Sequence, residues 1–261
     1  CNYHMSQRKR VEGYDISPEK MIEIGLSEKV DGFSYTYNEP TIFVEYAHDI
    51  GVLARKHELF NTFVTNGYMT EDTVNLLVDF LDAATVDIKG NAEPSFLKKY
   101  ALVPDPQPIF DTLILLRDKK IFIEITDLVV PEIGDNLDFA KKLLKWIYDN
   151  LGPETPVHFL RFFPSYKLSY LEPTPIGILK KHYDLARDIG MKYVYMGNVP
   201  GSPTENTYCP SCGKLLIRRY GFDIIEWNLK NGRCKYCGEK INVVYEDDTS
   251  WKKKNRFAYF F

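Results

Sequence analysis

Four cysteines near the C-terminus carry the most specific chemical pattern in the sequence. They form two pairs, Cys209-Pro-Ser-Cys212 and Cys234-Lys-Tyr-Cys237, each followed by glycine and separated by 21 residues. Each pair places two thiolates on one tight turn, and two such turns that face each other complete a tetrahedral site of four sulfur ligands. The pattern predicts a structural zinc ion, because four protein ligands leave no open position. A single iron ion and two disulfides remain the alternatives.

A second set of polar residues stands where apolar, strand-like segments end. If the strands are parallel, their carboxyl ends meet at one rim, where α/β barrels build active sites. Such a rim suits a zwitterionic ligand, because Glu39 can hold an ammonium group, Lys89 or Arg161 a carboxylate, and Asp87 a ribose hydroxyl. Taken singly, each residue could equally cap a helix or form a turn. The set is Asn38, Glu39, Thr65, Asn66, Asp87, Lys89, Thr126, Asp127, Arg161, Lys167 and Asn198.

The elements that must position these residues alternate between strand and helix. The alternation predicts βαβ units and one parallel sheet with right-handed crossovers. Six strands make a partial barrel, and we expect at least one further strand to precede Cys1. The predicted strands span residues 31–37, 60–65, 84–88, 121–130, 157–163 and 192–196, and the predicted helices span 18–26, 42–57, 70–81, 93–100, 108–119, 136–150 and 173–190.

A turn-rich segment over residues 199–207 predicts a domain boundary. We therefore expect a partial β/α barrel over residues 1–200 and a zinc-ribbon-like module with a C-terminal tail over 201–261. Two hairpin strands, 215–219 and 224–229, are predicted between the cysteine pairs. A segment this small has little hydrophobic core without its metal.

Composition narrows the class of protein further. The 261 residues carry a net charge of −3, with 44% hydrophobic and 26% charged residues, which is ordinary globular composition. Neither an apolar run of about 18–20 residues nor a secretory signal peptide is visible, so we expect no membrane association. Metal-type rather than disulfide-type cysteine spacing favours a reducing, cytoplasmic location.

Several segments together resemble a radical S-adenosylmethionine (SAM) enzyme of the pyruvate formate-lyase activating-enzyme type. The resemblance is greatest to the radical SAM component of the AmmeMemoRadiSam system. No single segment is diagnostic, but the set follows the family's order and spans nearly the whole chain. The segments are CNYHMSQ over residues 1–7, SYTYNEPT over 34–41, TNGY over 65–68, DIKG over 87–90, RFFPSYK over 161–167 and GNVPG over 197–201.

The resemblance implies a [4Fe–4S] cluster and SAM as cofactors. Cys1 matches the third cysteine of the family's Cys-x3-Cys-x2-Cys loop, so the first two would precede residue 1. One thiolate cannot hold that cluster. A chain that begins at Cys1 is therefore expected to be inactive alone.

The same resemblance assigns roles to the strand-end residues. Glu39 stands in the segment that replaces the family's Gly-Gly-Glu-Pro, which implies contact with the SAM amino group, with Asn38 beside it. Thr65 and Asn66 would line the rim near SAM.

Three further contacts follow by resemblance. Asp87 and Lys89 match an Asp-x-Lys motif that engages the ribose and carboxylate end of SAM. Arg161 is a further expected contact. Phe163 stands where activating enzymes often have histidine, so that contact departs from the family pattern.

The implied reaction is an oxidoreductase step in which reductive cleavage of SAM gives a 5′-deoxyadenosyl radical that takes hydrogen from a substrate. The substrate is unknown; a protein glycine is one possibility and a small molecule another. The expected electron donor is a ferredoxin or flavodoxin.

A non-catalytic adaptor, or a degenerate paralogue on a barrel scaffold, is the alternative. The module carries basic and aromatic residues compatible with nucleic acid. The whole chain is slightly acidic, however, so nucleic acid is not the expected partner. These residues are Lys214, Arg218, Arg219, Lys230, Arg233, Tyr220 and Trp227.

Overall fold

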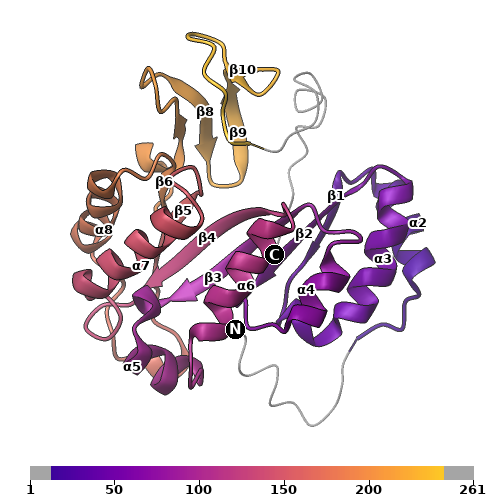
Figure 1. Ribbon diagram of the computed structural model, residues 1–261, viewed down its shortest axis with the longest axis horizontal. Coiled ribbons are helices and arrows are strands. Elements are labelled where there is room, and N and C mark those ends of the chain that lie inside the picture. Colours follow the sequence, from indigo (N-terminus) through magenta and orange to yellow (C-terminus); the bar gives the residue numbers. More distant parts are fainter. Residues whose placement is uncertain (1–12, 244–261) are drawn as a thin grey trace. The chain divides into compact units, whose positions relative to one another are not determined.

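A computed structural model describes residues 13–243, so Cys1 lies outside the described residues (Figure 1). The elements up to β4 are α2 (Pro18–Glu28), β1 (Gly32–Tyr35), η1 (Pro40–Phe43), α3 (Val44–Lys56), β2 (Phe60–Thr65), α4 (Glu71–Leu77), β3 (Ala83–Lys89), η2 (Gly90–Ala92), α5 (Pro94–Phe96), η3 (Leu97–Ala101), α6 (Gln107–Asp118) and β4 (Phe122–Val129). The later elements are α7 (Leu137–Asn150), β5 (Val157–Arg161), η4 (Tyr166–Leu168), α8 (Ile176–Ile189), β6 (Val194–Gly197), η5 (Pro203–Glu205), β7 (Thr207–Tyr208), β8 (Leu215–Tyr220), β9 (Asp223–Trp227), β10 (Leu229–Lys230) and β11 (Arg233–Cys234).

Strands β1 to β6 form one parallel sheet in chain order. Because each strand neighbours the next along the chain, the helices between them serve as crossovers of βαβ units. The predicted α/β class with a partial parallel barrel is thereby confirmed. The C-terminal strands are antiparallel, in the order β7-β8-β9 with a separate β10-β11 hairpin.

The chain forms two compact units. The first contains residues 13–88 and 103–125, and the second contains residues 89–102 and 126–243. The four cysteines and strands β5 and β6 all belong to the second unit. The predicted domain boundary near residue 200 lies inside this unit and stays a prediction.

Side chains along the central strands alternate strictly between two environments. In β3, Ala84, Val86 and Ile88 are buried, whereas Asp87 and Lys89 on the other side of the strand are half-buried. Strand β4 repeats the pattern over its eight residues. Alternation is the property of a pleated strand with one face in the core, so the other face is free to carry polar groups.

The predicted helix over 173–190 starts three residues too early, since α8 begins at Ile176. Thr174 precedes a proline, which disfavours helical backbone. Its buried hydroxyl instead donates to Val129 O and accepts from Phe162 N, at 2.7 and 3.0 Å. The predicted stop at Gly190 is confirmed, with φ at 107°. No helix among the described residues is long and apolar enough to cross a membrane.

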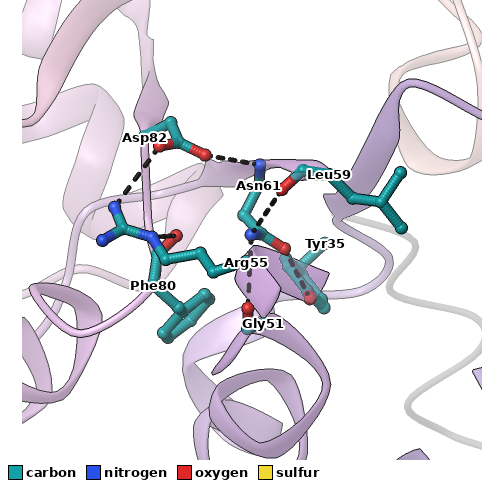
Figure 2. Close-up of polar contacts among 7 residues, drawn as sticks. All are labelled: Tyr35, Gly51, Arg55, Leu59, Asn61, Phe80 and Asp82. Atoms are coloured by element: carbon teal, nitrogen blue, oxygen red, sulfur yellow. Dashed lines mark hydrogen bonds and ion pairs between the residues drawn. The ribbon is translucent and has the colours of Figure 1, made fainter. Parts of the chain in front are cut away.

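A buried amide, Asn61, ties together the first unit (Figure 2). Its side chain is 0% exposed. The Tyr35 hydroxyl donates to Asn61 Oδ1 at 3.0 Å, and Asn61 Nδ2 donates to the carbonyls of Gly51 and Leu59 at 3.4 and 3.3 Å. The amide therefore links β1, β2 and α3, with both of its polar ends satisfied inside the core.

Asp82 extends this network to the start of β3 (Figure 2). Its carboxylate accepts the Asn61 backbone N–H at 2.8 Å and faces the Arg55 guanidinium at 3.3 Å. Arg55 Nε also donates to Phe80 O at 3.0 Å. The beginnings of β2 and β3 are thus held by charge-assisted hydrogen bonds as well as by the sheet.

We expect Tyr35→Phe to lower the free energy of unfolding by about 1–3 kcal/mol, because it leaves the buried Asn61 Oδ1 without its donor. Urea denaturation would measure the change. Tyr37→Phe is the matched control, since Tyr37 is 74% exposed and such a substitution changes stability by less than about 0.5 kcal/mol. Equal effects of the two substitutions would contradict the role given to Asn61.

Buried His182 on α8 makes the second unit sensitive to acid. Its Nδ1 lies 2.9 Å from Ile178 O, and its buried Nε2 has no hydrogen-bond partner in the described structure. Burial lowers the pKa of His182. The unfolded chain then binds the proton more readily, so stability is full above about pH 6.5 and falls as the pH drops below it.

We expect His182→Leu to remove part of this acid sensitivity, flattening the dependence of unfolding free energy on pH below about 6.5 by at most about 1.4 kcal/mol per pH unit. Denaturation at a series of pH values would measure the slope. His57→Gln, at an exposed position, is the control. A slope that changes as much in this control as in His182→Leu would contradict the assignment.

Candidate functional site

Glu39 lies where the chain leaves β1, as the residue that caps η1. Its Oε1 accepts from Thr65 Oγ1 at 2.6 Å, from Thr41 Oγ1 at 2.7 Å and from Thr41 N at 3.2 Å. Its Oε2 accepts from Asn66 N at 2.8 Å. Four donors, two from η1 and two from the end of β2, thus fix one carboxylate at the carboxyl edge of the sheet.

Thr41 was missed by the sequence-based reasoning, although it holds Glu39 twice. The signal was present in the sequence: a hydroxyl residue two positions after a cap can bond back to it. Its backbone N–H also donates to the Glu39 side chain, which caps the first turn of η1. Thr41 therefore orients the carboxylate from its own strand end, and Thr65 does so from the neighbouring strand.

Thr65 lies beneath Glu39 rather than at an exposed rim. It is 1% exposed, and its hydroxyl both donates to Glu39 and accepts from Gly67 N at 3.1 Å. Asn66 is half-buried and accepts from Tyr68 N through its side chain at 2.8 Å. Asn38 is half-buried next to Glu39. The structure thus gathers Asn38, Glu39, Thr65 and Asn66 at one place, with Thr65 in a supporting position.

Asp87 and Lys89 lie two residues apart on the half-buried side of β3. Their spacing follows from strand alternation, which turns residues i and i+2 to the same face. Both side chains are only half-buried, so either could reach a ligand on that face. Their predicted role toward SAM stays a prediction.

Arg161 ends β5, and its contacts lie within the second unit. Its Nε donates to Thr174 O at 2.9 Å, and its guanidinium lies 5.0 Å from the Phe163 ring centroid. By alternation Arg161 shares a side of the strand with the buried Val157 and Phe159. These contacts give it a local structural role, and a contact with SAM stays a prediction.

The four C-terminal cysteines converge on one point. Their Sγ atoms all lie within 4.8 Å of one another, with Cys209 to Cys237 at 3.6 Å and Cys212 to Cys234 at 3.8 Å. A zinc–sulfur bond of about 2.3 Å places the corners of a tetrahedron about 3.8 Å apart. A disulfide needs sulfurs about 2.05 Å apart. The spacing therefore fits a single tetrahedral ion and excludes the two-disulfide alternative.

The two cysteine turns are built alike. Cys209 N donates to Lys214 O and Cys234 N to Glu239 O, at 2.9 and 2.8 Å. The glycine after each second cysteine donates back to the first cysteine's carbonyl at 2.9 Å in both turns. Gly213 and Gly238 have φ values of 70° and 79°, a region that favours glycine. Both turns were predicted from the Cys-x2-Cys-Gly pattern.

The thiols of the four-cysteine site differ in pKa. Burial opposes ionisation of Cys234, but the N–H groups of Tyr236 and Cys237 and the neighbouring thiols lower its pKa to about 7. For Cys237, the N–H of Glu239 acts to lower the pKa, but burial and the other thiols raise it to about 12. A divalent ion that replaces these protons binds all four sulfurs at once, so metal affinity falls as the pH drops.

The Glu39 site fits the SAM amino group in its donor and acceptor balance. A carboxylate offers about four lone-pair positions, and Oε2 accepts one of the four hydrogen bonds that the described residues make to Glu39. Oε2 can therefore accept one more, from an ammonium. For the [4Fe–4S] cluster, Cys1 lies outside the described residues, and the other four cysteines are gathered in their own site.

The fold is similar to that of radical SAM enzymes of known structure. A domain of pyruvate-formate lyase-activating enzyme from Bacteroides vulgatus aligns over 64% of this chain and 99% of its own, with a TM-score of 0.54 and 14% identity. SuiB from Streptococcus suis bound to S-adenosylmethionine aligns over 73% of this chain and 45% of its own, with a TM-score of 0.57 and 10% identity. The anSMEcpe structure with bound AdoMet and Kp18Cys peptide aligns over 70% of this chain and 54% of its own, with a TM-score of 0.51 and 17% identity.

These likenesses define the class of fold of the parallel sheet, a partial radical SAM barrel. The four-cysteine module follows it in the chain. The chain spans about half the length of SuiB and of anSMEcpe. In sequence, it is 44% identical to the uncharacterized protein MJ0808 of Methanocaldococcus jannaschii over 232 residues, which are 88% of this chain and 68% of that protein. The chain belongs to the same family as MJ0808.

A family model described as "Bacterial Peptidase A24 N-terminal domain" matches residues 196–246. The match includes all four cysteines of the C-terminal site but covers only about a fifth of the chain. It is therefore a likeness of the module and does not extend to the barrel.

We expect one tightly bound metal ion per chain, held by the four-cysteine site. Cys234→Ser should abolish stoichiometric metal binding and destabilise the module, since three thiolates no longer close the tetrahedron. Metal analysis after dialysis against a chelator would measure binding. Ser211→Ala is the control, because it changes an exposed residue of the same turn that offers no thiolate. Retained stoichiometric metal in Cys234→Ser would contradict the site.

Proposed function

We propose that this protein is a radical SAM enzyme, similar to the pyruvate formate-lyase activating enzymes, that belongs to the AmmeMemoRadiSam group. The observation that carries the proposal is the Glu39 carboxylate, fixed by four donors at the carboxyl edge of a radical SAM-type sheet. The carboxyl edge is where α/β sheets bind their ligands.

Glu39 is proposed to hold the amino group of SAM through Oε2. The carboxylate is already oriented by Thr41 and Thr65, so little conformational entropy is lost when the ammonium binds. Asn66 contributes its backbone N–H to Glu39, and its side chain accepts a hydrogen bond from Tyr68 N. Thr65 acts through Glu39, because its single O–H donates to that carboxylate and its side chain is only 1% exposed.

The remaining contacts follow from charge. Lys89 is proposed to hold the carboxylate of SAM, Asp87 a ribose hydroxyl, and Arg161 a further part of the ligand. When bound, a reduced [4Fe–4S] cluster supplies the electron that cleaves SAM to methionine and a 5′-deoxyadenosyl radical, which abstracts hydrogen from the substrate. The chain's own task is to orient SAM and to exclude water from the radical. Cys1 is the cluster ligand that this chain would contribute.

A peptide or protein is the proposed class of substrate, with a backbone glycine as one candidate. The anSMEcpe structure, a fold relative, holds a peptide together with AdoMet. The proposed electron donor is a ferredoxin or flavodoxin. A reducing cytoplasm is the proposed location, since the four C-terminal cysteines have the spacing of a metal site and form no disulfide.

Zinc is the proposed metal of the four-cysteine site, and bracing of the barrel is its proposed role. The spacing of the sulfurs fits this ion, and four protein ligands leave no position for a substrate. An iron ion at the same ligands is the alternative that metal analysis decides.

The proposal is tested on protein extended upstream of Cys1, reconstituted under anaerobic conditions. We expect about four irons and one zinc per chain, and release of 5′-deoxyadenosine on reduction with SAM present. Zinc without iron would exclude the radical mechanism and leave an adaptor or a degenerate paralogue on a barrel scaffold.

In the same extended protein, we expect Glu39→Gln to weaken SAM binding by about 10-fold to 150-fold, as for loss of a charged hydrogen bond worth about 1.5–3 kcal/mol. Isothermal titration would measure the dissociation constant. Glu45→Gln, at an exposed position on α3, is the matched control. Thermal denaturation of both variants separates loss of binding from loss of folding, and unchanged affinity in a folded Glu39→Gln would remove Glu39 from the SAM site.

A further inference from the structure

His158 and Tyr195 form a stacked pair on the side of the sheet away from its buried core. They are register partners on β5 and β6, with ring centroids 4.6 Å apart and an interplanar angle of 18°. Their strand neighbours Val157, Phe159 and Val194 are buried, whereas both rings are half-buried. Strand alternation therefore places the pair on the face that carries the polar side chains.

Two residues of the four-cysteine module hold this pair. Thr207 Oγ1 lies 3.0 Å from the Tyr195 hydroxyl, and Arg219 Nη1 donates to the same Thr207 oxygen at 2.8 Å. The guanidinium carbon of Arg219 lies 5.8 Å from the Tyr195 ring centroid. Tyr195 is thus fixed at its hydroxyl by Thr207 and at its ring by Arg219 and His158.

These two residues are themselves positioned by the metal site. Thr207 belongs to β7, two residues before Cys209, and pairs with Ile217 of β8, the strand that carries Arg219. Cys209 and Ile217 are buried in one small cluster, against which Tyr195 packs. Release of Cys209 from a metal would therefore act directly on the strand that presents Thr207.

We propose that Thr207 and Arg219 are positioning residues through which metal loading of the four-cysteine module sets the geometry of Tyr195 and His158 on the polar face of the sheet. The module then sets the geometry of side chains on β5 and β6 and does more than brace the barrel. The relevance of this coupling to catalysis rests on the proposed function, because only that proposal gives this face of the sheet a substrate. The coupling itself needs no SAM chemistry.

The sequence offers a matched pair of arginines for the test. Arg218 and Arg219 are adjacent on β8, and their guanidinium groups make different contacts. Arg218 is exposed and pairs with Glu226 at 3.1 Å. Arg219 faces Tyr195. Removal of either guanidinium takes one positive charge from the same strand, but only Arg219→Gln breaks the contacts to the pair.

The experiment follows the His158 ring by NMR in histidine-labelled protein of this chain loaded with zinc. Tyr195→Leu first gives the shift that the full loss of the tyrosine ring causes. We expect removal of zinc, and separately Arg219→Gln, to move the His158 resonance by at least half of that shift. Arg218→Gln should leave it in place, and the resonances of His48 and His57, in the first unit, serve as internal references.

Reciprocity supplies an independent measurement. If bound metal favours the fixed geometry of His158 and Tyr195, then the contacts that fix this geometry must in turn favour metal binding. Loss of these contacts should therefore weaken metal binding. We expect Arg219→Gln to lower zinc affinity by at least about fivefold relative to Arg218→Gln, measured by competition with a chromophoric chelator. Arg219→Lys, which keeps the charge without the forked geometry, should recover only part of the loss.

A His158 resonance that ignores both zinc removal and Arg219→Gln overturns the proposal, as does equal zinc affinity in the two glutamine variants. Neither measurement requires the cluster or SAM. Failure of the extended protein to bind iron would sink the proposed function and leave the coupling intact. A failed NMR test would sink the coupling and leave the proposed function intact.

Discussion

The alternation of side chains along β3 and β4 is the constraint on which the candidate site depends. One side of each strand is buried, and this burial supplies the stabilisation that holds the strands in place. The other side of each strand does not have to be apolar for the strand to be stable, so it can carry polar groups such as Asp87 and Lys89. A shift of one residue in register would exchange the two sides. The position of the polar residues is therefore set by apolar packing on the opposite face.

Hydrogen bonds at the strand ends then refine what alternation provides. Glu39 caps η1 through Thr41 N, so the carboxylate satisfies a backbone donor that would otherwise be left without a partner. The same carboxylate accepts from Thr65 and Asn66 of the next strand. The Glu39 carboxylate thus joins the segment after β1 to the end of β2, and it presents a charge at the edge of the sheet. The structural role of Glu39 and its proposed ligand-binding role coincide in one carboxylate, which is why its substitution must be judged by folding and by binding together.

The sequence predicted elements well where local signals were strong. Strand β2 has the predicted bounds, and the Cys-x2-Cys-Gly pattern predicted both turns of the metal site, because each depends on neighbouring residues. The predicted start of α8 was wrong because Thr174 instead donates a hydrogen bond to Val129, a residue 45 positions away in the chain. The buried state of Thr65 and the stacking of Tyr195 on His158 depend on pairing between strands. Such contacts leave no local pattern in one sequence.

The small core of the module explains why a metal could influence the sheet at all. Its buried cluster includes Cys209 and Cys234 as members, together with Tyr193 beside β6. Residues 207–243 carry seven lysines and arginines against three acidic residues, and four thiolates around a divalent ion offset two of the four excess positive charges. The ion therefore supplies both cohesion and charge balance to a segment with little apolar area of its own. A module with a larger core would hold Thr207 and Arg219 in place without the ion, and the Tyr195 contact would then be independent of metal.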